Sequence, residues 1–286
     1  FKIADDQMTG PGIFFFFSGL IIGLFAVQAL VKLKLTKRPI KMIVVSDEEK
    51  LHMHSNAYDI IAAECQGGAY GLNLEGSKDD PQHVGTHNRG GMIVDVTVHG
   101  RAAHSGAEPE KGRSAIIELA HQIIKLDQLT DLAAGVHVNS GIIRGGISEN
   151  IIPDKATTSL GVRFKTNQQR VDLLNAIKKI AANPTIPDTT TTVKVRTKID
   201  SMEETPEVRQ LFEQLNQVAQ EIGYGKLEAV GGGGASDAGI MVAHGVPTID
   251  AMGVVGGGAH SEREYASAES LLNKAVLIAN FIAQQN

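Results

Sequence analysis

The chain has 286 residues, of which 42% are hydrophobic and 21% are charged. This composition excludes a fibre or a largely disordered chain, and the length predicts about two domains. The 27 basic residues against 32 acidic ones leave a formal charge of −5, so no basic surplus points to nucleic acid. Cys65 is the only cysteine, which excludes an internal disulfide and favours a reducing compartment such as the cytoplasm.

The first long apolar segment runs from residue 13 to residue 31 and carries no charged side chain. Asp5 and Asp6 precede it, which disfavours a signal peptide, and Lys32 and Lys34 follow it. Taken alone, the segment allows two interpretations. One is a membrane-spanning helix with a positive flank, and the other is a helix buried on all sides in an α/β domain.

Short apolar runs and a helical stretch come next, as in an α/β domain. Residues 40–45 predict a buried strand that ends in an acidic segment, 47–49. A helix around residues 57–65 leads to a second short strand, 69–74, which ends at Glu75.

From residue 90 the predicted elements follow the order strand, helix, strand, strand, helix, strand. Their segments are 91–98, 112–127, 134–144, 157–164, 168–182 and 190–199. This order is typical of the split βαβ unit of ferredoxin-like sandwiches. We therefore predict an α/β domain, residues 1–89 and 198–286, that is interrupted by an inserted α+β domain at residues 90–197.

The last part of the chain returns to the α/β pattern. A helix over 206–222 precedes a glycine run at 231–234 and a short helix from about Ser236. A strand at 246–252, a glycine-rich loop and a terminal helix complete the chain. The glycine run lacks both the GxGxxG and the GxxxxGK[ST] pattern, which favours a close-approach turn over a phosphate loop.

Side chains that bind metals follow three predicted strands, at the strand ends where open α/β sheets bind ligands. Glu48 and Glu49 follow the first, Glu75 the second, and the loop to His260 the third. Glu and His without Cys suit Zn²⁺ or Mn²⁺. Each acid taken singly is equally typical of a helix cap or a surface charge, whereas their coincidence favours a hydrolytic metal site. We expect His52 to lie at the surface.

Motifs along nearly the whole chain resemble those of the M20 metallopeptidases, the glutamate carboxypeptidase and aminoacylase-like amidohydrolases. The matching stretches are GPGI at 10–13, SDEE at 46–49, LNLEG at 72–76, GRAAHSGAEPEKGRSAI at 100–116, SENIIPDKATTSLGVRF at 148–164, GGGGASDA at 231–238 and GGGAHSEREY at 256–265. The resemblance implies a zinc-binding α/β catalytic domain with an inserted ferredoxin-like dimerisation domain. It also identifies the first apolar segment as a buried helix of the fold.

By this resemblance, Glu48 corresponds to the general base of the family. Glu49, Glu75 and His260 correspond to metal ligands of a centre that holds two zinc ions per subunit, with Mn²⁺ or Co²⁺ as alternatives. His104 corresponds to a histidine that reaches across a homodimer to polarise the scissile carbonyl.

Three further residues correspond to the substrate site. Asn150 and Arg163 match positions that bind the substrate carboxylate, a role that suits a bidentate guanidinium. The glycine-rich turn that contains Gly234 would form one wall of the substrate cleft.

Two expected metal ligands are missing from this sequence. The His-x-Asp motif of the family should lie upstream of Phe1, which predicts that an N-terminal segment is absent. The Asp that bridges both metals should follow GPG, where this chain has four phenylalanines, residues 14–17. Both departures predict impaired metal binding and activity.

Two functions therefore remain open. The first is metal-dependent hydrolysis of an amide or peptide bond next to a carboxylate, in a small peptide or an N-acyl amino acid. The second is that of a non-catalytic dimeric relative, which keeps the fold and a carboxylate-binding pocket. A hydrolase anchored in a membrane by residues 13–31 is a third and weaker hypothesis.

Overall fold

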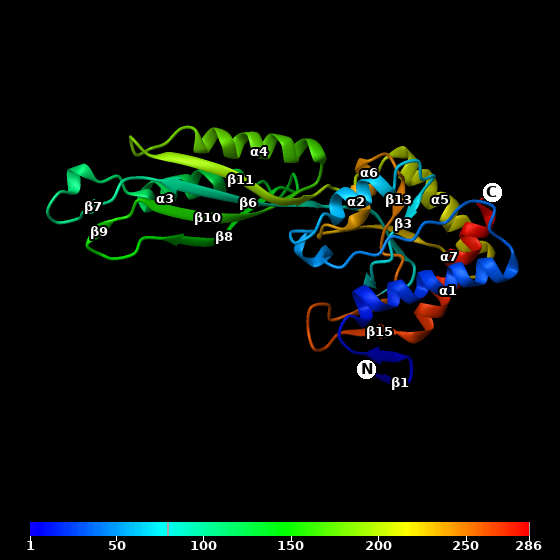
Figure 1. Ribbon diagram of the computed structural model, residues 1–286. Coiled ribbons are helices and arrows are strands. Elements are labelled where there is room, and N and C mark those ends of the chain that lie inside the picture. The colour runs from blue at the N-terminus through cyan, green and yellow to red at the C-terminus, as the bar shows by residue number, and fades with distance from the viewer. Residues whose placement is uncertain (79, 286) are drawn as a thin grey trace. The chain divides into compact units, whose positions relative to one another are not determined.

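The computed structural model describes residues 1–78 and 80–285 and divides into two compact units (Figure 1). The first comprises Phe1–Ser46, Ala57–Asn88 and Met202–Asn286, and the second comprises Asp47–Asn56 and Arg89–Ser201. The acidic segment 47–49, which we predicted to belong to the α/β domain, thus belongs to the second unit.

The second unit is built on a four-stranded antiparallel sheet in the order β11-β6-β10-β8. Its strands are β6 (Gly90–His99), β7 (Ala103–His104), β8 (His137–Gly145), β9 (Ile151–Ile152), β10 (Lys155–Phe164) and β11 (Thr190–Ile199), and its helices are η2 (Glu48–Lys50), η3 (Pro109–Lys111), α3 (Ala115–Asp127) and α4 (Asn167–Ala181). The chain order β6-α3-β8-β10-α4-β11 confirms the ferredoxin-like fold that the sequence predicts.

Alternation along the strands explains why this sheet forms. Every second residue of β10 is buried, from Ala156 to Phe164, and these side chains share a core with α3 and α4. Both helices begin at sequence-encoded caps. Ser114 accepts a hydrogen bond from the Ile117 N–H, and Thr166 forms a capping box with Gln169.

The first unit is an α/β arrangement of small sheets and helices. Its strands are β1 (Lys2–Ala4), β2 (Gln7–Thr9), β3 (Gly71–Leu72), β4 (Ser77–Lys78), β5 (His83–Asn88), β12 (Glu228–Gly232), β13 (Thr248–Ile249), β14 (Val255–Gly257) and β15 (Tyr265–Ser267), and its helices are η1 (Ile13–Phe17), α1 (Ser18–Leu33), α2 (Ala57–Glu64), α5 (Pro206–Glu221), α6 (Asp237–Ala243) and α7 (Ala268–Gln284). Strands β13 and β3, and likewise β12 and β5, pair in parallel, while β1, β2, β15, β14 and β4 form a mixed sheet.

The first apolar segment forms the short π-helix η1 and then α1, which packs against α7. The prediction of a helix buried on all sides is wrong. Small residues such as Gly19 and Gly23 let one face approach Leu74, but Leu24 and Phe25 on the other face are each about half exposed. Among the described residues, no helix combines the length and the apolarity needed to cross a membrane.

Residues 40–45 also differ from expectation. They form no strand, and Ile40, Met42 and Val44 are exposed. A β-forming run becomes a strand only when another strand pairs with it. Within the described part of the chain, β3 pairs with β13 and no strand pairs with residues 40–45. The first of the three expected strand ends is therefore not formed.

Candidate active site

The second and third predicted strand ends lie together in the first unit. The parallel pair β3 and β13 ends beside Asn73, and the Gly253 N–H donates to the Glu75 carbonyl at 2.7 Å. Glu75 itself is half-buried. The loop that leads away from Gly253 carries His260, which is exposed and has a left-handed φ of 62°. The parallel pairing thus brings Glu75 to the base of the loop that presents His260.

The segment with the four phenylalanines is held by a buried carboxylate. Glu264 accepts hydrogen bonds from the Gly12 N–H at 2.8 Å and the Phe14 N–H at 2.7 Å. The Phe14 ring is buried, and it is so close to Gly76 that a Cβ there would overlap it. The phenylalanine side chain at position 14 therefore fills part of the core next to Glu75.

Glu48 and Glu49 lie in η2, at the start of a tightly folded segment of the second unit. Asp47 accepts a hydrogen bond from the Ser55 hydroxyl at 2.7 Å, and its Oδ1 lies 3.2 Å from the His52 Nδ1. These contacts, with the Ser55 bond first, lower the pKa of Asp47. The expectation that His52 lies at the surface is wrong, because the turn closed by Asp47 buries its ring.

His104 and Asn150 lie side by side on a small ribbon of the second unit. Strands β7 and β9 pair with His104 opposite Ile151, and the Ser105 N–H donates to the Asn150 carbonyl at 2.9 Å. The imidazole Nδ1 of His104 accepts from the N–H groups of Gly106 and Ala107, at 3.2 and 3.1 Å. A nitrogen that accepts two backbone hydrogen bonds carries no proton, so Nε2 holds it and faces solvent as a donor.

Arg163 lies near the last residue of β10, at one end of the four-stranded sheet. It pairs with Gly91 and His137, whereas the other end of β10, Lys155, pairs with His99. Eight residues of strand at roughly 3.4 Å each separate Arg163 from Lys155 by about 27 Å. Burial lowers the pKa of the Arg163 guanidinium, which nevertheless stays protonated. The ribbon of β7 and β9 continues beyond the far end of the sheet, so one chain does not bring Arg163 to Asn150 (Figure 1).

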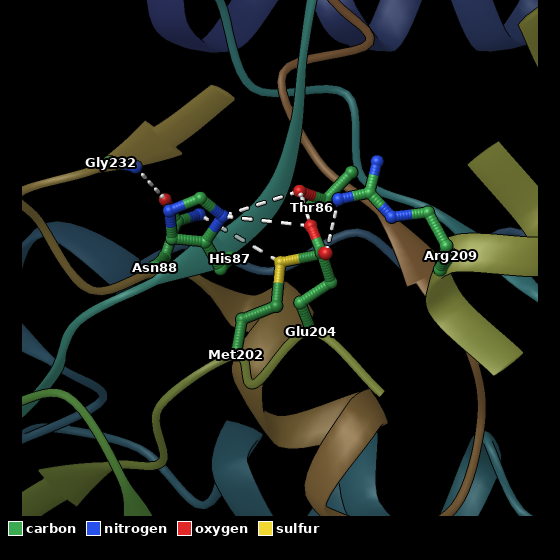
Figure 2. Close-up of polar contacts among 7 residues, drawn as sticks. All are labelled: Thr86, His87, Asn88, Met202, Glu204, Arg209 and Gly232. Atoms are coloured by element: carbon green, nitrogen blue, oxygen red, sulfur yellow. Dashed lines mark hydrogen bonds and ion pairs between the residues drawn. The ribbon is translucent and has the colours of Figure 1, made fainter. Parts of the chain in front are cut away.

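The glycine-rich turn, residues 231–235, is fixed at its first end by Asn88. The Gly232 N–H donates to the Asn88 Oδ1 at 2.6 Å, as Figure 2 shows. A Cβ on Gly233 or Gly234 would meet no atom within 4 Å among the described residues. The turn thus presents bare backbone at its tip. The close approach predicted from the sequence occurs only at its first end, where a Cβ on Gly231 would overlap His87 and one on Gly232 would overlap Asn88.

A second polar cluster beside the turn was not predicted. Glu204 accepts hydrogen bonds from the Thr86 hydroxyl and the Arg209 guanidinium, and its Oε2 lies 3.9 Å from the His87 Nδ1 (Figure 2). Partial burial opposes ionisation, but the bonds from Thr86 and Arg209 prevail and lower the pKa of Glu204. The His87 ring packs over Gly231, where no side chain would fit.

The residues present can be tested as a metal site by their chemistry and their arrangement. Carboxylate and imidazole donors suit zinc. Across residues 1–78 and 80–285, however, no three His, Cys, Asp or Glu side chains are grouped so that they could hold an ion. Glu75 and His260 belong to the first unit and Glu49 to the second. The donors of either unit do not by themselves fit a metal ion.

Comparison with known proteins identifies the inserted unit directly. Residues 86–189 match the family model of the peptidase dimerisation domain. The chain is 26% identical over 286 residues to carboxypeptidase G2 from Pseudomonas sp. (strain RS-16), a match that spans 99% of this chain and 68% of that protein.

Two solved structures share the fold along the chain. An aminopeptidase PepT from Bacillus cereus superposes with a TM-score of 0.75 at 23% identity, covering 99% of this chain and 75% of that one. An M20 family metallo-carboxypeptidase from Sulfolobus solfataricus gives a TM-score of 0.69 at 16% identity, covering 99% and 78%.

The fold and these matches first define a class: an α/β unit of the peptidase and amidohydrolase type that carries an inserted dimerisation domain. The family-model match and the similarity to carboxypeptidase G2 support the resemblance to the M20 metallopeptidases that the motifs indicate.

Proposed function

We propose that the chain is a metal-dependent hydrolase that cleaves the amide bond next to a free carboxylate, in a small peptide or an N-acyl amino acid. The observation that carries this proposal is the geometry of His104. Its Nδ1 accepts two backbone hydrogen bonds, which fix the orientation of the ring and leave the Nε2–H as the hydrogen-bond donor. A donor preset in this way suits the oxygen of a scissile carbonyl, on which negative charge develops in the transition state.

Arg163 supports the choice of a carboxylate substrate. Its half-buried guanidinium donates within the chain to the Val162 carbonyl at 3.4 Å, a long bond that leaves most of its N–H groups for a ligand. A guanidinium can hold a carboxylate through two parallel hydrogen bonds. We therefore assign Arg163 to the substrate carboxylate and Gly234 to the backbone wall of the cleft.

The separation of about 27 Å along β10 favours a site made by two copies of the chain. A substrate bound by Arg163 of one copy would receive His104 and Asn150 from the second. Exposed isoleucines on α3 and on the edge strand β8, such as Ile117, Ile124 and Ile142, support a homodimer through the inserted domain. The match to a dimerisation domain points the same way.

We assign the remaining roles from the motif resemblance. Glu48 would take a proton from the attacking water and deliver it to the leaving amide nitrogen. Glu49, Glu75 and His260 would be metal ligands, with zinc as the expected ion and Mn²⁺ or Co²⁺ as alternatives. The phenylalanines at 14–17 stand against this assignment, so metal dependence must be measured.

The test combines metal content with activity. The purified chain and a Phe15→Asp variant, which restores a carboxylate where the family motif has one, are analysed by mass spectrometry for bound metal. Both are then assayed on N-acyl amino acids and dipeptides, with and without a chelator. Chelator-sensitive hydrolysis by either chain supports the proposal. Inert chains that nevertheless carry stoichiometric metal would overturn it.

The second candidate function is a non-catalytic dimeric relative with a carboxylate-binding pocket. One observation favours it: the buried Phe14 ring is fitted against Gly76, beside the proposed ligand Glu75. This candidate predicts that an N-acyl amino acid binds by calorimetry without turnover, and that Arg163→Lys weakens the binding.

A further inference from the structure

Asp250 is a buried carboxylate that the proposed reaction does not use. It follows β13 and is 3% exposed. Four donors bind it: the Asn88 side-chain amide, the Ser236 hydroxyl at 2.7 Å, the Asn73 side-chain amide at 2.8 Å and the Ala251 N–H at 2.8 Å. Burial raises the pKa of Asp250, and these hydrogen bonds oppose that shift.

Two of these donors hold the two ends of the glycine-rich turn: Asn88 binds its first end from β5, and Ser236 follows its last residue. Asn88 uses its amide nitrogen on Asp250 and its Oδ1 on the Gly232 N–H, so it connects the carboxylate to the first end of the turn. Ser236 lies at the other end, immediately before α6. At this N-cap position a serine hydroxyl commonly binds the helix backbone, but here it forms no such bond and donates to Asp250 instead.

The backbone of Asp250 also fixes the strand that carries Asn88. The Asp250 N–H donates to the Gly85 carbonyl at 2.9 Å, and the Gly85 N–H donates to the Asp250 carbonyl at 2.8 Å. A Cβ on Gly85 would lie 2.8 Å from the Asp250 Cβ, so the two backbones approach as closely as a glycine allows. Asp250 thus contacts β5 through both its main chain and its side chain.

We propose that Asp250 is a positioning residue that sets the glycine-rich turn, residues 231–235, by holding Asn88 at one end of it and Ser236 at the other. The turn itself has no side chains beyond Ala235 that could hold it in place. The effect of the turn on substrate binding rests on the proposed function, whereas the positioning can be measured without any substrate.

The choice of Asp at this position follows from the donors around it. All four partners donate, so the group between them must accept at both oxygens. An asparagine would direct its own NH₂ at one pair of donors and leave them unsatisfied in a buried site. Asp250→Asn therefore keeps the side-chain volume nearly constant but replaces one of the two acceptor oxygens by an NH₂ group.

The experiment is amide hydrogen exchange of the turn, measured by mass spectrometry on the full chain. We expect Asp250→Asn and Asn88→Ala to speed exchange of the 231–236 amides by about ten-fold or more, because a buried hydrogen bond to a charged group is lost. Asn73→Ala is the matched control, since the Asn73 side chain also donates to Asp250 and, among the described residues, forms no hydrogen bond with residues 231–236. It should change exchange in the turn by less than about two-fold.

Two outcomes would overturn the proposal: unchanged exchange in the turn of Asp250→Asn, or an equal effect of Asn73→Ala. If Asp250→Asn fails to fold, Ser236→Ala answers the same question, because it removes one hydroxyl and should free the second end of the turn. Where the chain hydrolyses a substrate, these variants should raise KM more than they lower kcat. The exchange rates can be measured even on a chain without activity. The positioning role of Asp250 and the proposed hydrolase function can therefore be refuted independently.

Discussion

The buried ring of Phe14 lies over Gly76, the residue that follows Glu75, so closely that a Cβ on Gly76 would overlap it. Gly256, on β14, borders the same ring, and a Cβ there would lie 2.8 Å from its Cδ2 atom. Two glycines from distant parts of the chain thus make the space that the ring fills. Phe14 is therefore an integral part of the first unit as it folds.

Replacing Phe14 by Asp should destabilise the first unit strongly. Removal of a buried phenylalanine costs about 3–5 kcal/mol, and an unpaired carboxylate in its place adds to that cost. Phe17→Asp is the control, because Phe17 is 52% exposed, and it should cost less than about 0.5 kcal/mol. Urea unfolding of both variants measures the difference, and equal losses would contradict this placement of the two rings.

Glu264→Gln tests the carboxylate that binds the Gly12 and Phe14 N–H groups. Glutamine keeps one acceptor oxygen and places an NH₂ against the other backbone donor, so we expect a loss of about 2 kcal/mol in unfolding free energy. Glu262→Gln makes the same chemical change at an exposed position of the same loop and should be nearly neutral. A neutral Glu264→Gln would show that this anchor contributes little.

Gly232→Ala and Gly233→Ala form a matched pair within the glycine-rich turn. A Cβ on Gly232 would overlap the Asn88 side-chain oxygen, whereas one on Gly233 would meet no described atom within 4 Å. We expect the first change to cost about 1–3 kcal/mol and the second to be close to neutral. Thermal unfolding of the two variants compares them directly, and the reverse order would refute this geometry.

Lys274 should make stability depend on pH in the alkaline range. The side chain is fully buried, with Nζ 3.5 Å from the Ala251 carbonyl oxygen, and burial lowers its pKa from 10.5 to about 8. Below pH 8 the folded chain bears the full cost of a buried charge, roughly 3 kcal/mol. Between pH 8 and 10.5 the unfolded chain binds more protons, so this cost is relieved as the pH rises.

Lys274→Met removes the charge at similar volume. At pH 7 the variant should be more stable than the parent, and the difference should shrink between pH 8 and 10.5. Urea unfolding at several pH values checks this trend. A difference that stays constant across the range would mean that Lys274 does not titrate there.

Local patterns predicted the elements whose formation depends on their own residues. Strand β11 has the predicted bounds because its alternation covers ten residues, and α3 and α4 begin at caps that can be identified in the sequence. The prediction of a strand at residues 40–45 was wrong because strand formation depends on a pairing partner, which a local pattern does not specify. The prediction that α1 is buried on all sides was wrong for a similar reason. An apolar run does not show which face of the helix other parts of the protein cover.

For the candidate site, too, some residues could be predicted from local motifs and others could not. Motifs indicated Glu75, His104 and Arg163, but the contacts that support the site join residues far apart in the chain. Asn88 and Asp250 are 162 positions apart, and Gly12 and Glu264 are 252 apart. No spacing rule for a single sequence covers such pairs. The separation of Arg163 from His104 likewise follows only from the strand register of β10.

That separation has a consequence for genetics. In the proposed homodimer, chains with His104→Ala would pair into dimers in which both proposed sites are defective, and so would chains with Arg163→Ala. In a mixed dimer, one site would combine the intact arginine of one chain with the intact histidine of the other. Co-expression of two inactive alleles should therefore restore activity at one site per mixed dimer, and dilution below the dimer dissociation constant should abolish it.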